Sequence, residues 1–100
     1  MTKLTLTQDA YISGAKDEAL NLINADGTER AECIWGPYYT ATAKDDDDNE
    51  YTIFWRILDD FDPDTDEDES NACNWDEPIM IIDEEDGRNL VAAGIEFEIA

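Results

Sequence analysis

Histidine is absent from this chain of 100 residues. Histidine is the general base of the Ser–His and Cys–His catalytic pairs and a common metal ligand, so its absence excludes those pairs and histidine-based metal centres. The two cysteines, Cys33 and Cys73, have neither a histidine nor a cluster of cations near them in sequence to activate a thiolate. We therefore expect a protein that is not an enzyme, with no catalytic residues and no cofactor.

Cations are also scarce. The chain has 6 Lys plus Arg against 27 Asp plus Glu, a formal net charge of -21 that destabilises the folded state by self-repulsion. The excess is regional, because residues 1–43 contain six acidic and three basic residues, whereas residues 44–100 contain twenty-one and three. Adaptation to high salt would spread the charge over the whole surface, so the asymmetry favours a charged partner over that alternative.

Long apolar runs are missing as well. No segment approaches the roughly 18 apolar residues of a membrane span, and the N-terminal residues contain no apolar signal region. These absences predict a cytoplasmic protein without membrane contact. In a reducing compartment we expect Cys33 and Cys73 to be buried free thiols, with a disulfide between them as the alternative.

What is present argues for a folded body. The hydrophobic fraction is 42% and aromatic residues make up 10% of the chain, which is too many for a disordered acidic tail. A chain of this length forms one domain, residues 1–100. Apolar periodicity and bounding turn residues predict strands at residues 3–7, 30–35, 38–43, 50–58, 79–82 and 94–99.

One segment has a different period. Ala15, Ala19, Leu22 and Ile23 recur at helical spacing and predict a helix over residues 15–24. The dipeptide Gly36-Pro37 predicts a kink or bulge, and residues 44–49 predict an exposed hairpin loop. The predicted fold is therefore α+β, an antiparallel sheet of five or six strands, the terminal strand included, with one packed helix.

The carboxylates are concentrated in runs. Residues 58–78 contain ten of them and no cation, so they either face water as a repelling loop or bind a positively charged partner. For one carboxylate the solvated loop is the better interpretation, but the runs together favour binding. The candidate partner-binding residues are Asp45, Asp46, Asp47, Asp48, Glu50, Asp59, Asp60, Asp62, Asp64, Asp66, Glu67, Asp68, Glu69, Asp76, Glu77, Asp83, Glu84, Glu85 and Asp86.

Position in the sequence ranks these candidates. Asp59, Asp60 and Asp62 directly follow the predicted strand at residues 50–58, so we expect them to contribute more than the carboxylates of residues 64–69, whose loop must be ordered on binding. Trp75 is interpreted as an anchor that fixes the acidic loop to the core, with an interface role as the alternative.

Alternate carboxylates at residues 62–68 are similar in spacing to a calcium-binding EF-hand loop. Counted from Asp62, the sixth position is Glu67, where glycine is needed, and the twelfth is Cys73, where a bidentate glutamate belongs. We expect no dedicated metal site, and a weak divalent-cation site is the alternative.

The net charge is also similar to that of a short DNA duplex. Duplex DNA carries one negative charge per about 1.7 Å, so some 21 charges correspond to roughly 36 Å of duplex, comparable with a domain of this size. Carboxylates fixed on strands and hairpins would accept the Lys and Arg hydrogen bonds that phosphates normally accept.

In its small size, lack of histidine and acidic runs at residues 45–48, 59–69 and 83–86, the chain resembles the small acidic DNA-mimic inhibitors of phages and mobile elements, such as anti-CRISPR and anti-restriction proteins. The resemblance is to a class. It implies a phage protein that acts in the host cytoplasm by protein-protein interaction, blocking the channel of a basic nucleic-acid-binding complex without binding nucleic acid itself. Two alternatives stay open, an acidic divalent-cation-binding module and an immunity protein that neutralises a basic toxin.

Overall fold

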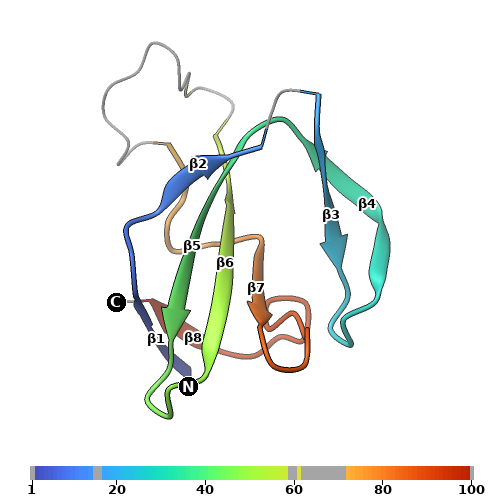
Figure 1. The fold of residues 1–100 in the computed structure, drawn as a ribbon. Helices are drawn as coiled ribbons and strands as arrows, with labels where there is room; N and C mark the ends of the chain where they lie inside the picture. The colour runs from blue at the N-terminus through green and yellow to red at the C-terminus, as the bar shows by residue number, and fades with distance from the viewer. Residues whose placement is uncertain (1, 15–16, 59–60, 62–71, 100) are drawn as a thin grey trace.

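The computed structural model describes residues 2–14, 17–58, 61 and 72–99. In these residues the chain forms eight strands and no helix (Figure 1). The strands are β1 (Thr2–Leu6), β2 (Tyr11–Ser13), β3 (Ala19–Ile23), β4 (Glu29–Trp35), β5 (Tyr38–Lys44), β6 (Glu50–Arg56), β7 (Met80–Asp83) and β8 (Phe97–Ile99). The predicted α+β class is therefore wrong, and the described chain is all-β.

The predicted helix at residues 15–24 is wrong because its central residues form β3. β3 pairs antiparallel with β4, Ala19 opposite Trp35 and Leu20 opposite Ile34. Over so short a stretch the apolar residues satisfy helical spacing, but cross-strand pairing decides the conformation. Residues 15 and 16 lie outside the described residues.

Most strands form one six-stranded sheet in the order β7-β6-β5-β1-β8, with β2 also paired to β5. At its centre, β5 and β6 are antiparallel from Tyr38 opposite Arg56 to Lys44 opposite Glu50. Tyr51, Ile53 and Trp55 are buried at alternate positions of β6, so the predicted two-residue period of this strand is confirmed. These side chains belong to a core that extends to β1 and β7.

The last strand has a different direction from the one predicted. β8 is parallel to β1, with Phe97 opposite Thr2 and Ile99 opposite Leu4, and residues 94–96 precede it without being part of it. Alternation in sequence indicates which residues share a face of a strand, but it contains no information on strand direction. Direction is set by the route of residues 84–96, which return the chain to the start of β1.

β3 and β4 form a separate two-stranded sheet. Together with their connecting turn, residues 24–28, we call it the arm. Gly36, with φ of 89°, and Pro37 lie between β4 and β5, so the predicted kink is a change from one sheet to the other. Figure 1 shows the arm beside β7, with β4 on its outer side. No residue of β3 or β4 is buried.

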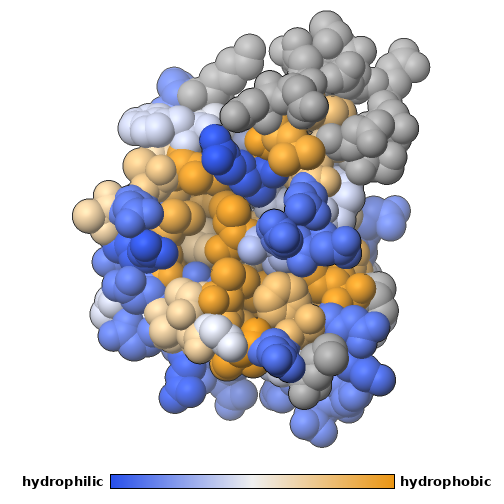
Figure 2. Space-filling model, turned by 180° about the vertical axis from the view of Figure 1, so that it is seen from behind, coloured by the Kyte–Doolittle hydropathy of each residue, from blue (hydrophilic) through white to orange (hydrophobic). Residues whose placement is uncertain are grey.

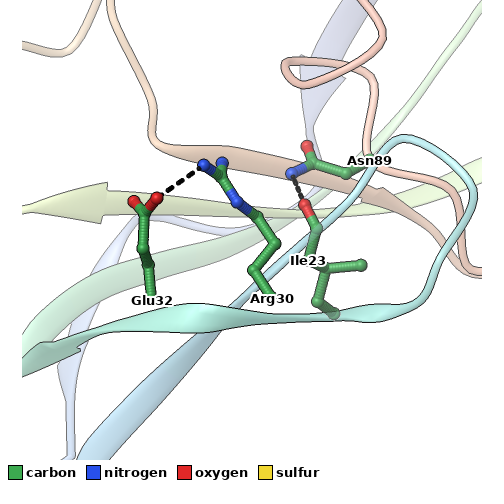
Figure 3. A network of polar contacts seen from close by, with 4 residues as sticks. All are labelled: Ile23, Arg30, Glu32 and Asn89. Atoms are coloured by element: carbon green, nitrogen blue, oxygen red, sulfur yellow. Dashed lines mark hydrogen bonds and ion pairs between the residues drawn. The ribbon is translucent and has the colours of Figure 1, made fainter.

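The arm is fastened to the main sheet near its turn. Buried Asn89 donates from Nδ2 to the Ile23 carbonyl at 2.8 Å (Figure 3). Its Oδ1 accepts from the amides of Ile81 and Val91, each at 3.2 Å. Gly27 has φ of 89° and lies so close to the segment after β7 that an added Cβ would be 3.0 Å from a backbone oxygen. The arm turn therefore packs against the turn that follows β7.

Apolar side chains also reach the surface. Seen from behind, hydrophobic residues occupy much of the middle of the molecule and hydrophilic residues border them (Figure 2). In the described chain the large exposed hydrophobic residues are Tyr11, Ile12, Trp35, Leu58 and Ile95. No helix long and apolar enough to cross a membrane occurs among the described residues.

Both cysteines are free, as predicted. Cys73 is buried, and burial raises the pKa of its thiol to about 11. Cys33 is half-buried in β4, so the expectation of burial is confirmed for Cys73 only.

Candidate functional site

Two acidic turns lie side by side at one end of the main sheet. One connects β5 to β6, and the other follows β7. They meet because β6 pairs antiparallel with β5 on one side and with β7 on the other. The amide of Glu84 donates to the carbonyl of Glu50 at 3.1 Å, which joins the second turn to the start of β6. We define the acidic end as Asp45, Asp46, Asp47, Asp48, Glu50, Asp83, Glu84, Glu85 and Asp86.

Asp45 organises the first turn. Its Oδ1 accepts from the amides of Asp47 and Asn49, both at 2.9 Å. Its Oδ2 accepts from the Asn49 side chain and the Tyr51 hydroxyl, both at 3.0 Å. The Asn49 side chain is the main reason why the pKa of Asp45 lies below its usual value, while burial and then Asp45 raise the pKa of Tyr51 to about 12. Asp45 is thus a structural residue of this turn.

The second turn is also held by its own carboxylates. Asp83 Oδ1 accepts from the Glu85 amide at 2.9 Å. Asp86 accepts from the Arg88 amide at 3.1 Å and forms an ion pair with the Arg88 side chain at 3.3 Å. The Thr52 hydroxyl donates to Glu84, which connects the turn to β6. Three of its four carboxylates therefore shape the turn as well as charging it.

The remaining carboxylates of the acidic end are available to a partner. Asp46, Asp47, Asp48, Glu50 and Glu85 all have exposed side chains. Residues 44–50 and 83–88 together contain nine carboxylates against two cations, Lys44 and Arg88. The result is an anionic surface fixed on two hydrogen-bonded turns, and it suits cationic groups that approach from solvent.

Asp76 and Glu77 are exposed but do not belong to the acidic end. They precede β7, and the amide of Ile79 donates to the carbonyl of Phe54 near the far end of β6. β6 is seven residues long, so its two ends lie roughly 20 Å apart at the usual rise per residue. The predicted site is thus divided between the two ends of the sheet.

The longest predicted run lies outside the described residues. This applies to Asp59, Asp60, Asp62, Asp64, Asp66, Glu67, Asp68 and Glu69. The expectation that Asp59, Asp60 and Asp62 contribute more than the later carboxylates therefore stays a prediction.

Trp75 has the anchoring contacts expected of it. Its ring packs edge-on against Tyr39 and Trp55, with centroid distances of 5.3 and 5.1 Å. Its carbonyl accepts a hydrogen bond from Trp55 Nε1 at 3.1 Å. The predicted packing of Trp75 against the core is confirmed, while most of the acidic loop that it was expected to anchor lies outside the described residues.

Sequence reasoning did not predict that the turns at residues 45–49 and 84–87 would be neighbours. A signal was present, because the strand at residues 50–58 was predicted to lie in an antiparallel sheet. If it has an antiparallel neighbour on each side, the turn before it and the turn after the later neighbour lie at the same end of the sheet. The role of Asn89 was also missed, since one asparagine after an Asp-Gly turn has no pattern that distinguishes it from a loop residue.

The described residues contain no group of three or more Cys, Asp or Glu side chains placed to hold a metal ion. Comparison of the chain with protein-family models, curated proteins and solved structures gave no match.

Proposed function

We propose that this protein inhibits a basic nucleic-acid-binding protein or complex by occupying its DNA channel, in the manner of anti-CRISPR or anti-restriction DNA mimics. The acidic end is the observation that carries the proposal, since it brings nine carboxylates together on two adjacent turns. Both turns are held by β6 and by their own hydrogen bonds, so binding of a partner would cost little free energy for ordering them.

The size of the molecule agrees with this role. Its longest dimension is 39 Å, and duplex DNA of that length carries about 23 negative charges. The chain has a formal net charge of -21. Lysine and arginine side chains that line a DNA channel would form charge-assisted hydrogen bonds with these carboxylates as they do with phosphates.

Competition with DNA tests the proposal. A pull-down from a bacterial lysate identifies the target, and binding is then measured with and without duplex DNA. We expect the protein and DNA to exclude one another. A ternary complex containing both would contradict the proposal.

A charge-matched pair of variants tests the position of the carboxylates. Asp46→Asn with Asp47→Asn removes two charges from the acidic end, and Asp76→Asn with Glu77→Gln removes two from the opposite end of β6. We expect the first pair to cost about 2–5 kcal/mol of binding free energy, because cations of the channel are left desolvated and unpaired, and the second mainly to slow association. Equal losses that disappear together at high salt would indicate diffuse attraction instead of mimicry.

A further inference from the structure

The arm carries an aromatic side chain that is largely exposed. Trp35, the last residue of β4, is 69% exposed, the highest value among the large hydrophobic residues of the described chain. Its partner across the arm is Ala19, whose small side chain leaves the indole ring uncovered. Tryptophan is enriched among the binding hot spots of protein interfaces.

The backbone beside Trp35 is open as well. The amide of Gly36 donates to the carbonyl of Glu18 at 3.1 Å, so Glu18 and Gly36 form a hydrogen-bonded pair. In an antiparallel ladder such pairs alternate with non-hydrogen-bonded pairs, here Ala19 with Trp35 and Asn21 with Cys33. The N–H and C=O groups of Cys33 and Trp35 therefore point away from β3, along the free edge of β4. Figure 1 shows this edge on the outer side of the arm.

This edge has no strand partner in the part of the chain that the structure describes. A two-stranded sheet is marginally stable by itself, and none of its residues is buried here. A third strand would satisfy the edge groups and add a cross-strand neighbour beside Trp35.

The charge of the arm region indicates which kind of strand would pair with this edge. Residues 17–35 contain five carboxylates and one cation, Arg30, which pairs with Glu32 at 3.0 Å (Figure 3). A second copy of this chain would bring another net charge of -21 to an edge that is already negative, and the repulsion disfavours it. The complementary occupant is an extended cationic segment.

We propose that the outer edge of β4 binds an extended arginine- or lysine-rich segment of a basic protein as an added strand, with one cationic side chain over the Trp35 ring. The guanidinium or ammonium group interacts with the face of the indole, and the carboxylates of residues 17–35 attract its charge. This inference rests on the proposed function in one respect, that the partner is a basic protein, and it assigns that partner a second point of contact.

The test uses the intact protein and a labelled peptide of alternating arginine and valine, with binding followed by fluorescence anisotropy at low and high salt. One control peptide carries N-methyl groups at alternate residues, which keeps the charge and blocks strand pairing. A second control replaces arginine with citrulline, which keeps the shape and removes the charge. We expect the unmodified peptide to bind more tightly than either control, and the Trp35→Ala variant to bind it about tenfold or more weakly at both salt concentrations.

Tyr11→Ala is the matched variant, because Tyr11 is also an exposed aromatic residue but lies on β2 of the main sheet. Trp35→Phe, which keeps an aromatic face, should restore part of the affinity. Equal binding of the N-methylated peptide, equal losses in Trp35→Ala and Tyr11→Ala, or a Trp35-dependent dimer in sedimentation would each overturn the inference. Trp35-dependent peptide binding together with failed DNA competition would contradict the proposed function and still support the binding site on the arm.

Discussion

The β5–β6 hairpin and the arm are built by the same local rules and differ in their surroundings. Each has two antiparallel strands and a turn organised by an aspartate. Asp45 accepts hydrogen bonds from the amides of its turn, and Asp26 accepts them from the amide and the hydroxyl of Thr28. Yet alternate residues of β6 are buried, whereas no residue of the arm is.

The difference shows that turn chemistry and strand pairing are not enough to make a rigid hairpin. β6 has strands on both sides and a core beneath it, so burial of apolar area stabilises it. The arm is held to the main sheet mainly near one end, through Asn89 and the close approach of Gly27. The acidic end is therefore a fixed surface, whereas the arm is the part most able to adapt to a partner.

The largest expected contrast is between two tryptophans. Trp55 is 1% exposed and Trp35 is 69% exposed. Trp55→Ala should lower the free energy of unfolding by about 3–5 kcal/mol, because it leaves a cavity in the core. Trp35→Ala should change it by less than about 0.5 kcal/mol. Urea denaturation measures both, and comparable losses would mean that the arm contributes to global stability as the main sheet does.

A smaller effect is expected at the connection between the two regions. Asn89→Ala leaves the amides of Ile81 and Val91 and the carbonyl of Ile23 without this partner, which should cost about 1–3 kcal/mol. Amide exchange in β3 and β4 should accelerate more than exchange in β5 and β6. Asn21→Ala, at an exposed position of β3, is the control and should change neither quantity. Uniform acceleration over all strands would show that Asn89 supports the core and does not specifically fasten the arm.

The same contrast explains what the sequence could predict. The strand at residues 50–58 was recognisable because tyrosine, isoleucine and tryptophan alternate with other residues, and half-burial in a sheet imposes that alternation. The hairpin loop at residues 44–49 followed from its run of turn-forming residues. β3 was mistaken for a helix because its apolar residues also satisfy helical spacing, and its strand character depends on β4.

For the candidate site, sequence identified the acidic runs but not their arrangement. Residues 45–48 and 83–86 are far apart in the chain, and only the pairing of β6 with both β5 and β7 brings them together. The distinction between Asp45, which holds its turn, and Asp46, which is exposed, was equally inaccessible, because it depends on which oxygen meets which donor.

That distinction predicts different effects on stability at neighbouring positions. Asp45→Asn should lower stability at neutral pH, since an amide cannot accept from both the Asn49 side chain and the Tyr51 hydroxyl at the Oδ2 position. Asp46→Asn should leave stability unchanged or raise it slightly, because it only reduces repulsion.

The effect of Asp45 should depend on pH. Its pKa is lowered in the folded state, so its contribution is present above the unfolded pKa of about 3.9 and is lost as pH falls through the folded value. Thermal unfolding of the wild-type protein and Asp45→Asn should therefore differ at pH 7 and converge in acid. A difference that persists below both pKa values would contradict the assignment of the hydrogen bonds to the ionised carboxylate.

The last prediction compares the reactivity of the two thiols and concerns no change in stability. Cys33 is half-buried in the arm, whereas Cys73 is buried and its pKa is raised to about 11. The thiolate is the reactive form, so a shift of about two units from the ordinary value lowers its fraction about 100-fold at pH 8, before any steric protection. Labelling with a disulfide reagent should give one fast and one slow phase, and the fast phase should be absent from Cys33→Ser. If Cys33→Ser instead loses the slow phase, the arm protects its thiol better than the core does, and the proposed difference between the two regions is wrong.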